Sequence, residues 1–174
     1  LGLGNLAGRQ VDYETAHSLT EESLAIFKRA GDLPFLYIGL NLMGVIYSDQ
    51  GNYNTAREYF EEGLFLAQEV HDRLQVSLFL RNLGDIALST GDFDNALSFF
   101  EQFRRLIQDT PDDFYLNMVF FDIGEVARFQ GNYDKAIVSL EKCLQFEPDN
   151  PVVFFEMGKN YLSQKKYKDA YENF

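Results

Sequence analysis

The sequence predicts an all-α solenoid built from repeated antiparallel helix pairs. Three kinds of position, a glycine, an aromatic residue and an alanine, recur with a constant 40-residue period along the 174-residue chain, and a further unit follows at a shorter spacing. A fixed period of this length is typical of repeat proteins, in which each repeat is one supersecondary unit stacked on the next. The recurring residues are Gly4, Gly44, Gly84, Gly124 and Gly158; Tyr13, Tyr53, Phe93, Tyr133 and Tyr167; and Ala16, Ala56, Ala96, Ala136 and Ala170.

The first helix of each unit is predicted from an apolar stripe that surrounds the repeated glycine. In the third unit Leu80, Leu83 and Leu88 lie on one face at helical spacing. A turn containing a second glycine is expected to end this helix, because glycine readily adopts the left-handed conformation that closes a helix C-terminus. Those turn glycines are Gly51, Gly91 and Gly131, and Val11 and Lys165 replace them in the first and fifth units, where the turns are expected to differ.

The second helix of each unit is predicted to begin after a side chain that can accept a hydrogen bond from its free amide groups. In the second unit Ala56, Phe60 and Leu64 then fall on one face at i, i+4 and i+8. Small residues at Gly44 and Ala56 are expected to let the two helices approach closely. The expected capping residues are Asn52, Asp92 and Asn132.

This pattern resembles the tetratricopeptide repeat, and the resemblance covers essentially the whole chain. It implies a right-handed superhelix with units at about 1–36, 37–76, 77–116, 117–150 and 151–174, of which the first and last are truncated. It also implies a non-catalytic module that binds a protein or peptide in a concave groove lined by the first helices. The fourth unit matches the repeat best, with Phe120, Ile123, Gly124, Ala127, Gly131, Asn132, Tyr133, Ala136, Leu140 and Pro148.

The 40-residue spacing indicates a long-helix variant of this repeat, whose usual length is about 34 residues. The additional residues of each unit add about 9 Å if they are helical. The stretch 67–74 contains neither glycine nor proline. We therefore expect the additional residues to lengthen both helices.

The candidate partner-binding residues are those at positions that face the groove in the resembled family. They combine aromatic and basic side chains, which often dominate interface energies. One interpretation is that Arg81, Arg128 and Lys159 grip an acidic and apolar segment; the other is that some of the phenylalanines pack against neighbouring helices instead. The candidates are Asn41, Arg81, Asp85, Phe121, Glu125, Arg128, Phe129, Phe155 and Lys159.

Composition excludes several classes of function. With 15 Lys and Arg against 27 Asp and Glu, the net charge is −12, which argues against nucleic acid and anionic membranes as partners. No apolar run approaches the roughly 20 residues of a membrane-spanning helix. One cysteine and two histidines make neither a disulfide nor a metal site. Cys143 is expected to be buried rather than nucleophilic, so we expect no enzyme activity, cofactor or metal.

Two other classes of function remain open. The chain could be a regulatory or sensor segment of a larger signalling or transcription-regulating protein, or a structural scaffold that self-associates through uncapped ends. It begins within a first helix and without Met, so we expect it to be part of a longer protein. The expected location is the cytoplasm.

Overall fold

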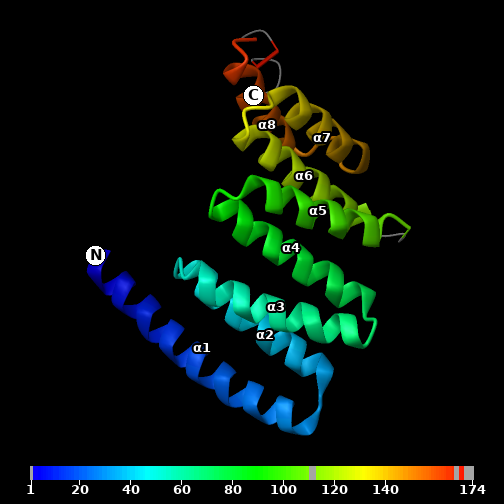
Figure 1. Ribbon diagram of the computed structural model, residues 1–174. Coiled ribbons are helices and arrows are strands. Elements are labelled where there is room, and N and C mark those ends of the chain that lie inside the picture. Colours follow the sequence, from blue (N-terminus) through cyan, green and yellow to red (C-terminus); the bar gives the residue numbers. More distant parts are fainter. Residues whose placement is uncertain (1, 110–112, 167–168, 171–174) are drawn as a thin grey trace. The chain divides into compact units, whose positions relative to one another are not determined.

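The computed structural model describes residues 2–109, 113–166 and 169–170, with side chains at 15, at 17–109 and from 114 onward within these ranges. These residues form eight α-helices and no strand (Figure 1), which confirms the all-α repeat class. The chain divides into two compact units, each containing more than one repeat: Leu1–Ile86 and Ala87–Phe174. We call these two parts of the chain the first unit and the second unit, and a single helix pair a repeat. The helices are α1 (Gly2–Ala30), α2 (Leu33–Asp49), α3 (Tyr53–Glu69), α4 (Arg73–Ser89), α5 (Phe93–Ile107), α6 (Asp113–Phe129), α7 (Tyr133–Phe146) and α8 (Pro151–Ser163).

The first repeat differs from the expected helix pair. The backbone of α1 is one unbroken helix of 29 residues, and it passes through Val11, where a turn was expected. A left-handed conformation is unfavourable for a β-branched residue, and the segment contains no proline that would interrupt the helix. The glycines near its start, including Gly4 and Gly8, are therefore helical.

The glycine turns have the predicted left-handed geometry. Gly51, Gly91 and Gly131 have φ values of 74°, 78° and 75°. In the first of these turns the amide of Gly51 donates to the Ser48 carbonyl at 2.9 Å, and the next amide donates to the Tyr47 carbonyl at 2.8 Å. These bonds satisfy carbonyl groups that the end of the helix would otherwise leave free.

The turn at Lys165 was expected to differ from the glycine turns, but it has the same left-handed geometry. Lys165 has a φ of 61°. Its amide donates to the Leu162 carbonyl at 2.9 Å, and the Lys166 amide donates to the Tyr161 carbonyl at 2.9 Å. The same turn therefore forms at the end of α8 without a glycine.

The predicted caps are confirmed at three helices. The side chains of Asn52, Asp92 and Asn132 accept hydrogen bonds from backbone amides three residues later, at 3.4, 3.4 and 3.3 Å. Asn150 caps α8 in the same way and accepts from the Val152 amide at 2.9 Å. Each contact satisfies an amide that the first turn of a helix leaves free.

The additional residues of the 40-residue repeat lie in the helices, as predicted. Helices α2, α3 and α4 each contain 17 residues, and only a short connection joins α3 to α4. His71, with a φ of 58°, makes this connection. The sequence contains no glycine there to indicate the end of α3.

Each unit has its own apolar core. In the first unit α2 packs against α3, and Leu40, Met43 and Phe60 are almost fully buried. In the second unit α6 packs against α7, and Val126, Leu140 and Val153 are equally buried. The repeated alanines Ala56, Ala96 and Ala136 have no exposed surface, as expected for positions where helices approach closely.

Candidate functional site

The candidate residues of the second unit that lie on α6 and α8 form a connected row of charges. Arg128 on α6 contacts Glu125 at 3.2 Å, and its Nε lies 3.9 Å from Oε2 of Glu156 on α8. Lys159 donates to Glu156 Oε1 at 2.8 Å and lies 2.7 Å from Oε2. The row therefore contains two basic and two acidic side chains.

Two exposed aromatic side chains lie at this row of charges. Phe129 and Phe155 are 51% and 52% exposed. The Arg128 guanidinium lies 4.2 Å from the centre of the Phe129 ring, and the Lys159 ammonium lies 5.4 Å from the centre of the Phe155 ring. Such cation–π contacts favour one ring position over others. We call the whole set the α6–α8 surface: Glu125, Arg128, Phe129, Phe155, Glu156 and Lys159.

Phe121 packs against neighbouring helices, which was the second interpretation of the candidate phenylalanines. Its ring is only partly exposed and packs against the core cluster that contains Ile137, Leu140 and Val153. Phe129 also makes a packing contact, since it stacks on Phe93 with ring centres 5.9 Å apart. Phe121 is thus mainly a packing residue, whereas Phe129 contributes to packing and to the exposed surface.

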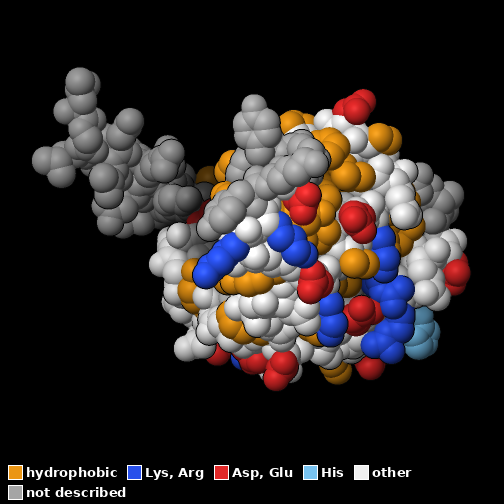
Figure 2. All heavy atoms as spheres, turned by 90° about the horizontal axis from the view of Figure 1, so that it is seen from above, with side chains coloured by type: hydrophobic (Ala, Val, Ile, Leu, Met, Phe, Trp, Pro, Cys, Tyr) orange, Lys and Arg blue, Asp and Glu red, His pale blue; other side chains and the backbone are white. Residues whose placement is uncertain are grey.

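Glu156, which was not among the residues predicted from the sequence, neutralises the row. Only 14% of its side chain is exposed, and it contacts both basic residues. Its spacing three residues before Lys159 repeats that of Glu125 before Arg128, and this parallel is the signal that could have identified it. Figure 2 shows acidic and basic side chains interspersed with hydrophobic ones on the face that it presents.

The candidate residues of the first unit lie on α2 and α4. Asn41 is exposed, and its side-chain Oδ1 accepts a hydrogen bond from the side-chain Nδ2 of Asn82 at 2.6 Å. Arg81 lies 3.6 Å from Asp85, one turn along α4. Beside Asn41, α2 has an exposed apolar stripe, which consists of Phe35, Ile38, Leu42 and Val45.

Cys143 is buried, as its register on the second helix predicts. Its side chain has no exposed surface, and its thiol donates to the Asn117 carbonyl at 3.4 Å. Burial, with a smaller contribution from Asp122, raises the pKa of the thiol to about 12. Among the described residues, no three His, Cys, Asp or Glu side chains are grouped so that they could hold a metal ion.

We expect Cys143 in the folded protein to resist alkylation. A pKa of about 12 in place of the ordinary value of 9.0 lowers the thiolate fraction at pH 8 by about a thousandfold, and the thiolate is the reactive form. Labelling with iodoacetamide in the absence and presence of urea, followed by mass spectrometry, would measure this difference. Equal labelling rates in the two conditions would contradict a buried thiol.

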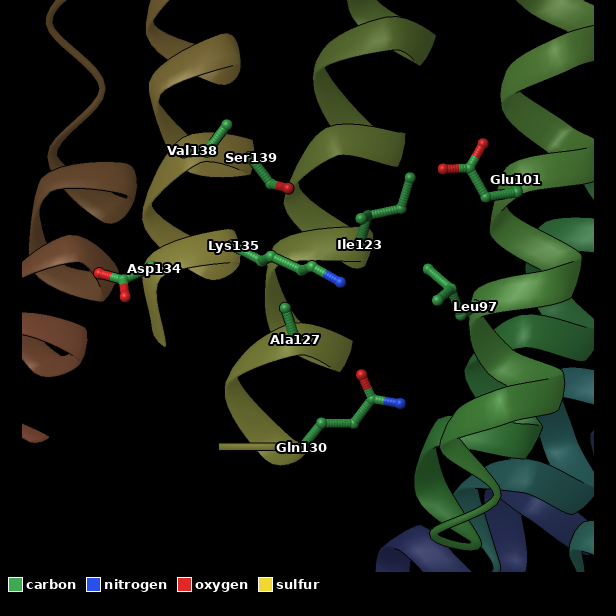
Figure 3. A pocket seen from close by; sticks show the side chains of 9 residues that line it. All are labelled: Leu97, Glu101, Ile123, Ala127, Gln130, Asp134, Lys135, Val138 and Ser139. Carbon is green, nitrogen blue, oxygen red and sulfur yellow. The ribbon is translucent and has the colours of Figure 1, made fainter. Parts of the chain in front are cut away.

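A pocket of about 440 Å³ lies between α5, α6 and α7. In Figure 3 Lys135 extends from α7 toward the centre of this pocket, Gln130 points toward α5, and Asp134 points away from it. The pocket was not predicted from the sequence, because it lies on the face of α6 opposite to the candidate residues. Its lining residues are Leu97, Glu101, Ile123, Ala127, Gln130, Asp134, Lys135, Val138 and Ser139.

Solved structures share this fold at low sequence identity. BtubC (BKLC) from P. vanneervenii has a TM-score of 0.83 at 20% identity, with 98% of this chain and 74% of that chain covered. A putative kinesin light chain with TPR-like repeats from Podospora anserina has a TM-score of 0.77 at 14% identity, with 98% and 88% covered. Cut9 in the APC/C hetero-tetramer Cut9–Hcn1 has a TM-score of 0.68 at 20% identity, with 86% and 30% covered.

The family assignment rests on a sequence match. Comparison with curated proteins finds no significant match. Separately, no helix in the described part of the chain is both long and apolar enough to cross a membrane. The tetratricopeptide repeat model matches residues 35–109 and 75–149, which together cover more than half of the sequence. The chain therefore belongs to the tetratricopeptide repeat family.

Proposed function

We propose that the α6–α8 surface binds a segment of a partner protein. Tetratricopeptide repeat proteins are protein-interaction modules and generally non-catalytic scaffolds, and Cut9 was solved in a hetero-tetramer with Hcn1. The observation that carries the proposal is the pair of half-exposed rings, Phe129 and Phe155, each held beside a cation. Aromatic and arginine side chains at the centre of a contact carry much of its binding energy.

The charges of this surface favour an apolar partner segment over a strongly acidic one. Arg128 and Lys159 are already balanced by Glu125 and Glu156. The Nε of Arg128 makes no hydrogen bond with a described residue, but it is buried and therefore closed to a partner. We therefore propose apolar contacts at the exposed rings of Phe129 and Phe155.

The first unit offers a separate surface of similar character. The exposed apolar residues of α2, Phe35, Ile38, Leu42 and Val45, lie at helical spacing next to Asn41. We propose this stripe as a second contact for a partner, with Arg81 and Asp85 at α4 as polar neighbours. Each surface is tested by itself in the experiment below.

We expect a photo-crosslinking residue at Phe155 to capture a partner that the same residue at Phe65 does not capture. Phe65 on α3 is also exposed, at 60%, but belongs to neither proposed surface. Benzoylphenylalanine would be placed at each position, and at Ile38 for the α2 stripe. The cross-linked proteins would then be identified by mass spectrometry.

Binding of the captured protein to purified variants then decides the proposal. Loss of the Phe155 ring in Phe155→Ala is expected to weaken binding by about thirtyfold or more, since interface hot spots contribute about 2 kcal/mol or more. Isothermal titration with the Phe65→Ala variant is the matched control, and it is expected to show unchanged affinity. If Phe65→Ala weakened binding while Phe155→Ala did not, the partner would occupy another face.

A further inference from the structure

The pocket between α5, α6 and α7 corresponds to an aromatic cluster in the first unit. The repeat has a 40-residue period, so two residues that are 80 positions apart occupy the same place in two repeats, one in the first unit and one in the second. The cluster consists of His17 on α1, Tyr47 on α2 and Tyr59 on α3. The equivalent residues are Leu97 on α5, Ala127 on α6 and Ser139 on α7, and all three line the pocket.

In the first unit, aromatic rings occupy the equivalent space. The rings of Tyr47 and Tyr59 are stacked, with centres 5.6 Å apart. The Tyr47 ring also contacts the His17 ring edge-on at 5.4 Å, and its hydroxyl lies 2.6 Å from His17 Nε2. Burial, together with the neighbouring Tyr47 and Glu21, raises the pKa of Tyr59. The cluster is therefore a partly desolvated aromatic contact between three helices.

In the second unit, small residues leave this space open. Alanine at 127 and serine at 139 remove both phenol rings, while Glu101 keeps the position that Glu21 has in the first unit. The resulting volume of about 440 Å³ falls within the range of about 300–1,000 Å³ that small-ligand pockets occupy. The pocket thus lies at the repeat positions of the aromatic cluster but lacks its rings.

The two acidic residues that line the pocket contact other side chains and form no ion pair with Lys135. Glu101 accepts from Arg104 at 2.8 Å, and Asp134 points away from the pocket and accepts from Gln164 at 2.7 Å. The Lys135 ammonium makes no ion pair or side-chain hydrogen bond with any described residue, although the chain has a net charge of −12. The first unit has uncharged Thr55 at the equivalent position. The pocket therefore carries a cation at a repeat position where the first unit has none.

We propose that this pocket binds an aromatic side chain of a partner peptide, with a carboxylate of the same peptide pairing with Lys135. Leu97, Ile123, Ala127 and Val138 supply apolar walls for the ring. Because Lys135 extends into the pocket and has no ion pair with a described residue, it favours an anionic group next to that ring. The ligand class is thus an aromatic residue adjacent to an acidic residue or a free carboxylate.

This pocket is distinct from the α6–α8 surface. On α6, the pocket residues Ile123 and Ala127 each follow a candidate residue, Phe121 or Glu125, by two positions. Two positions correspond to a rotation of about 200° around a helix. The two sites therefore lie on opposite faces of α6, and one can fail experimentally without the other.

The test uses 3-phenylpropionate as the probe and the full chain labelled with ¹⁵N. We expect saturable chemical-shift changes at the amides of Leu97, Ala127, Lys135 and Val138 at millimolar concentration, and none at Phe155. The uncharged 3-phenylpropanamide is expected to bind about twofold to fivefold more weakly, as for an exposed ion pair. Propionate, which lacks the ring, is expected to give no saturable change.

Refilling the pocket provides the decisive variant. Ala127→Tyr restores the ring found at Tyr47 and is expected to weaken probe binding by tenfold or more. Gln145→Tyr, at an exposed position of α7 outside the pocket, is the matched control and is expected to bind like the wild type. If Ala127→Tyr does not fold, as judged by circular dichroism, Ser139→Tyr restores the other ring.

Three results would overturn the proposal. The first is the absence of saturable shifts in the wild type. The second is unchanged binding to a folded refilled variant. The third is equal affinity of the wild type for the acid and the amide, the equality that the proposal expects only of Lys135→Gln, because the proposed ion pair would then not exist.

Discussion

Replacing Gly44 with alanine is expected to lower the free energy of unfolding by about 1–3 kcal/mol, the usual cost of overpacking a core. A Cβ at this position would collide with the ring of Phe60, which is only 2% exposed and cannot move into solvent. Hydrogen exchange of the α2 and α3 amides under native conditions would measure the loss, because it reports the stability of this unit separately.

Gly124 is the matched control, because it occupies the same position of the repeat. A Cβ there would lie 3.4 Å from the nearest atoms, the Ala136 carbonyl oxygen and the Leu140 side chain. Gly124→Ala is therefore expected to be neutral or to stabilise the protein by up to about 1 kcal/mol, since alanine favours a helix more than glycine does.

A double-mutant cycle identifies the cause of this difference. Phe60 and Leu140 are equivalent residues, 80 positions apart. In a Phe60→Leu background we expect Gly44→Ala to be much less destabilising, with a coupling energy of about 1 kcal/mol or more between the two sites. Equal costs of Gly44→Ala in both backgrounds would show that Phe60 is not the obstacle.

Removing the Phe100 side chain is expected to destabilise the second unit by about 3–5 kcal/mol, the range measured for truncating large buried aromatics. Phe100 has no exposed surface and lies on α5, at the repeat position equivalent to Phe60. Urea unfolding of Phe100→Ala, followed by circular dichroism in the far ultraviolet, would measure the change in midpoint.

Phe155→Ala is the control for Phe100→Ala within the same unit. Phe155 is half exposed and its ring lies beside Lys159. We expect its truncation to cost less than about 1 kcal/mol, because about half of its side chain is already in water. A similar loss in the two variants would contradict the assignment of Phe100 to the core and of Phe155 to the surface.

Local signals in the sequence predicted most of the helix ends. Gly51, Gly91 and Gly131 adopt the left-handed conformation, and Asn52, Asp92 and Asn132 cap the helices that follow. These predictions succeeded because each depends on a backbone conformation or hydrogen bond within a few residues. The end of α3 at His71 has no glycine signal and required the structure. At Lys165 the repeat register predicted a turn, and the structure showed that it has the same left-handed geometry as the glycine turns.

Contacts between helices determined what local signals could not. Glu156 joins Arg128 and Lys159 only because α6 and α8 bring these side chains together, with Arg128 Nε 3.9 Å from Glu156 Oε2. Phe121 faces core residues of α7 and α8, whereas Phe155 faces solvent. The sequence listed both phenylalanines as groove candidates and left open which of them pack against neighbouring helices, because the repeat register identifies a position but not the side chains that surround it.

The sequence by itself determined the family and the all-α repeat fold, because the recurring glycine, aromatic and alanine positions constrain every repeat in the same way. The tertiary structure determined how equivalent positions differ. Gly44 faces a phenylalanine and Gly124 a leucine, and the rings of Tyr47 and Tyr59 fill a space that Ala127 and Ser139 leave open. These differences depend on which side chains meet across three helices, and a periodic pattern does not specify that.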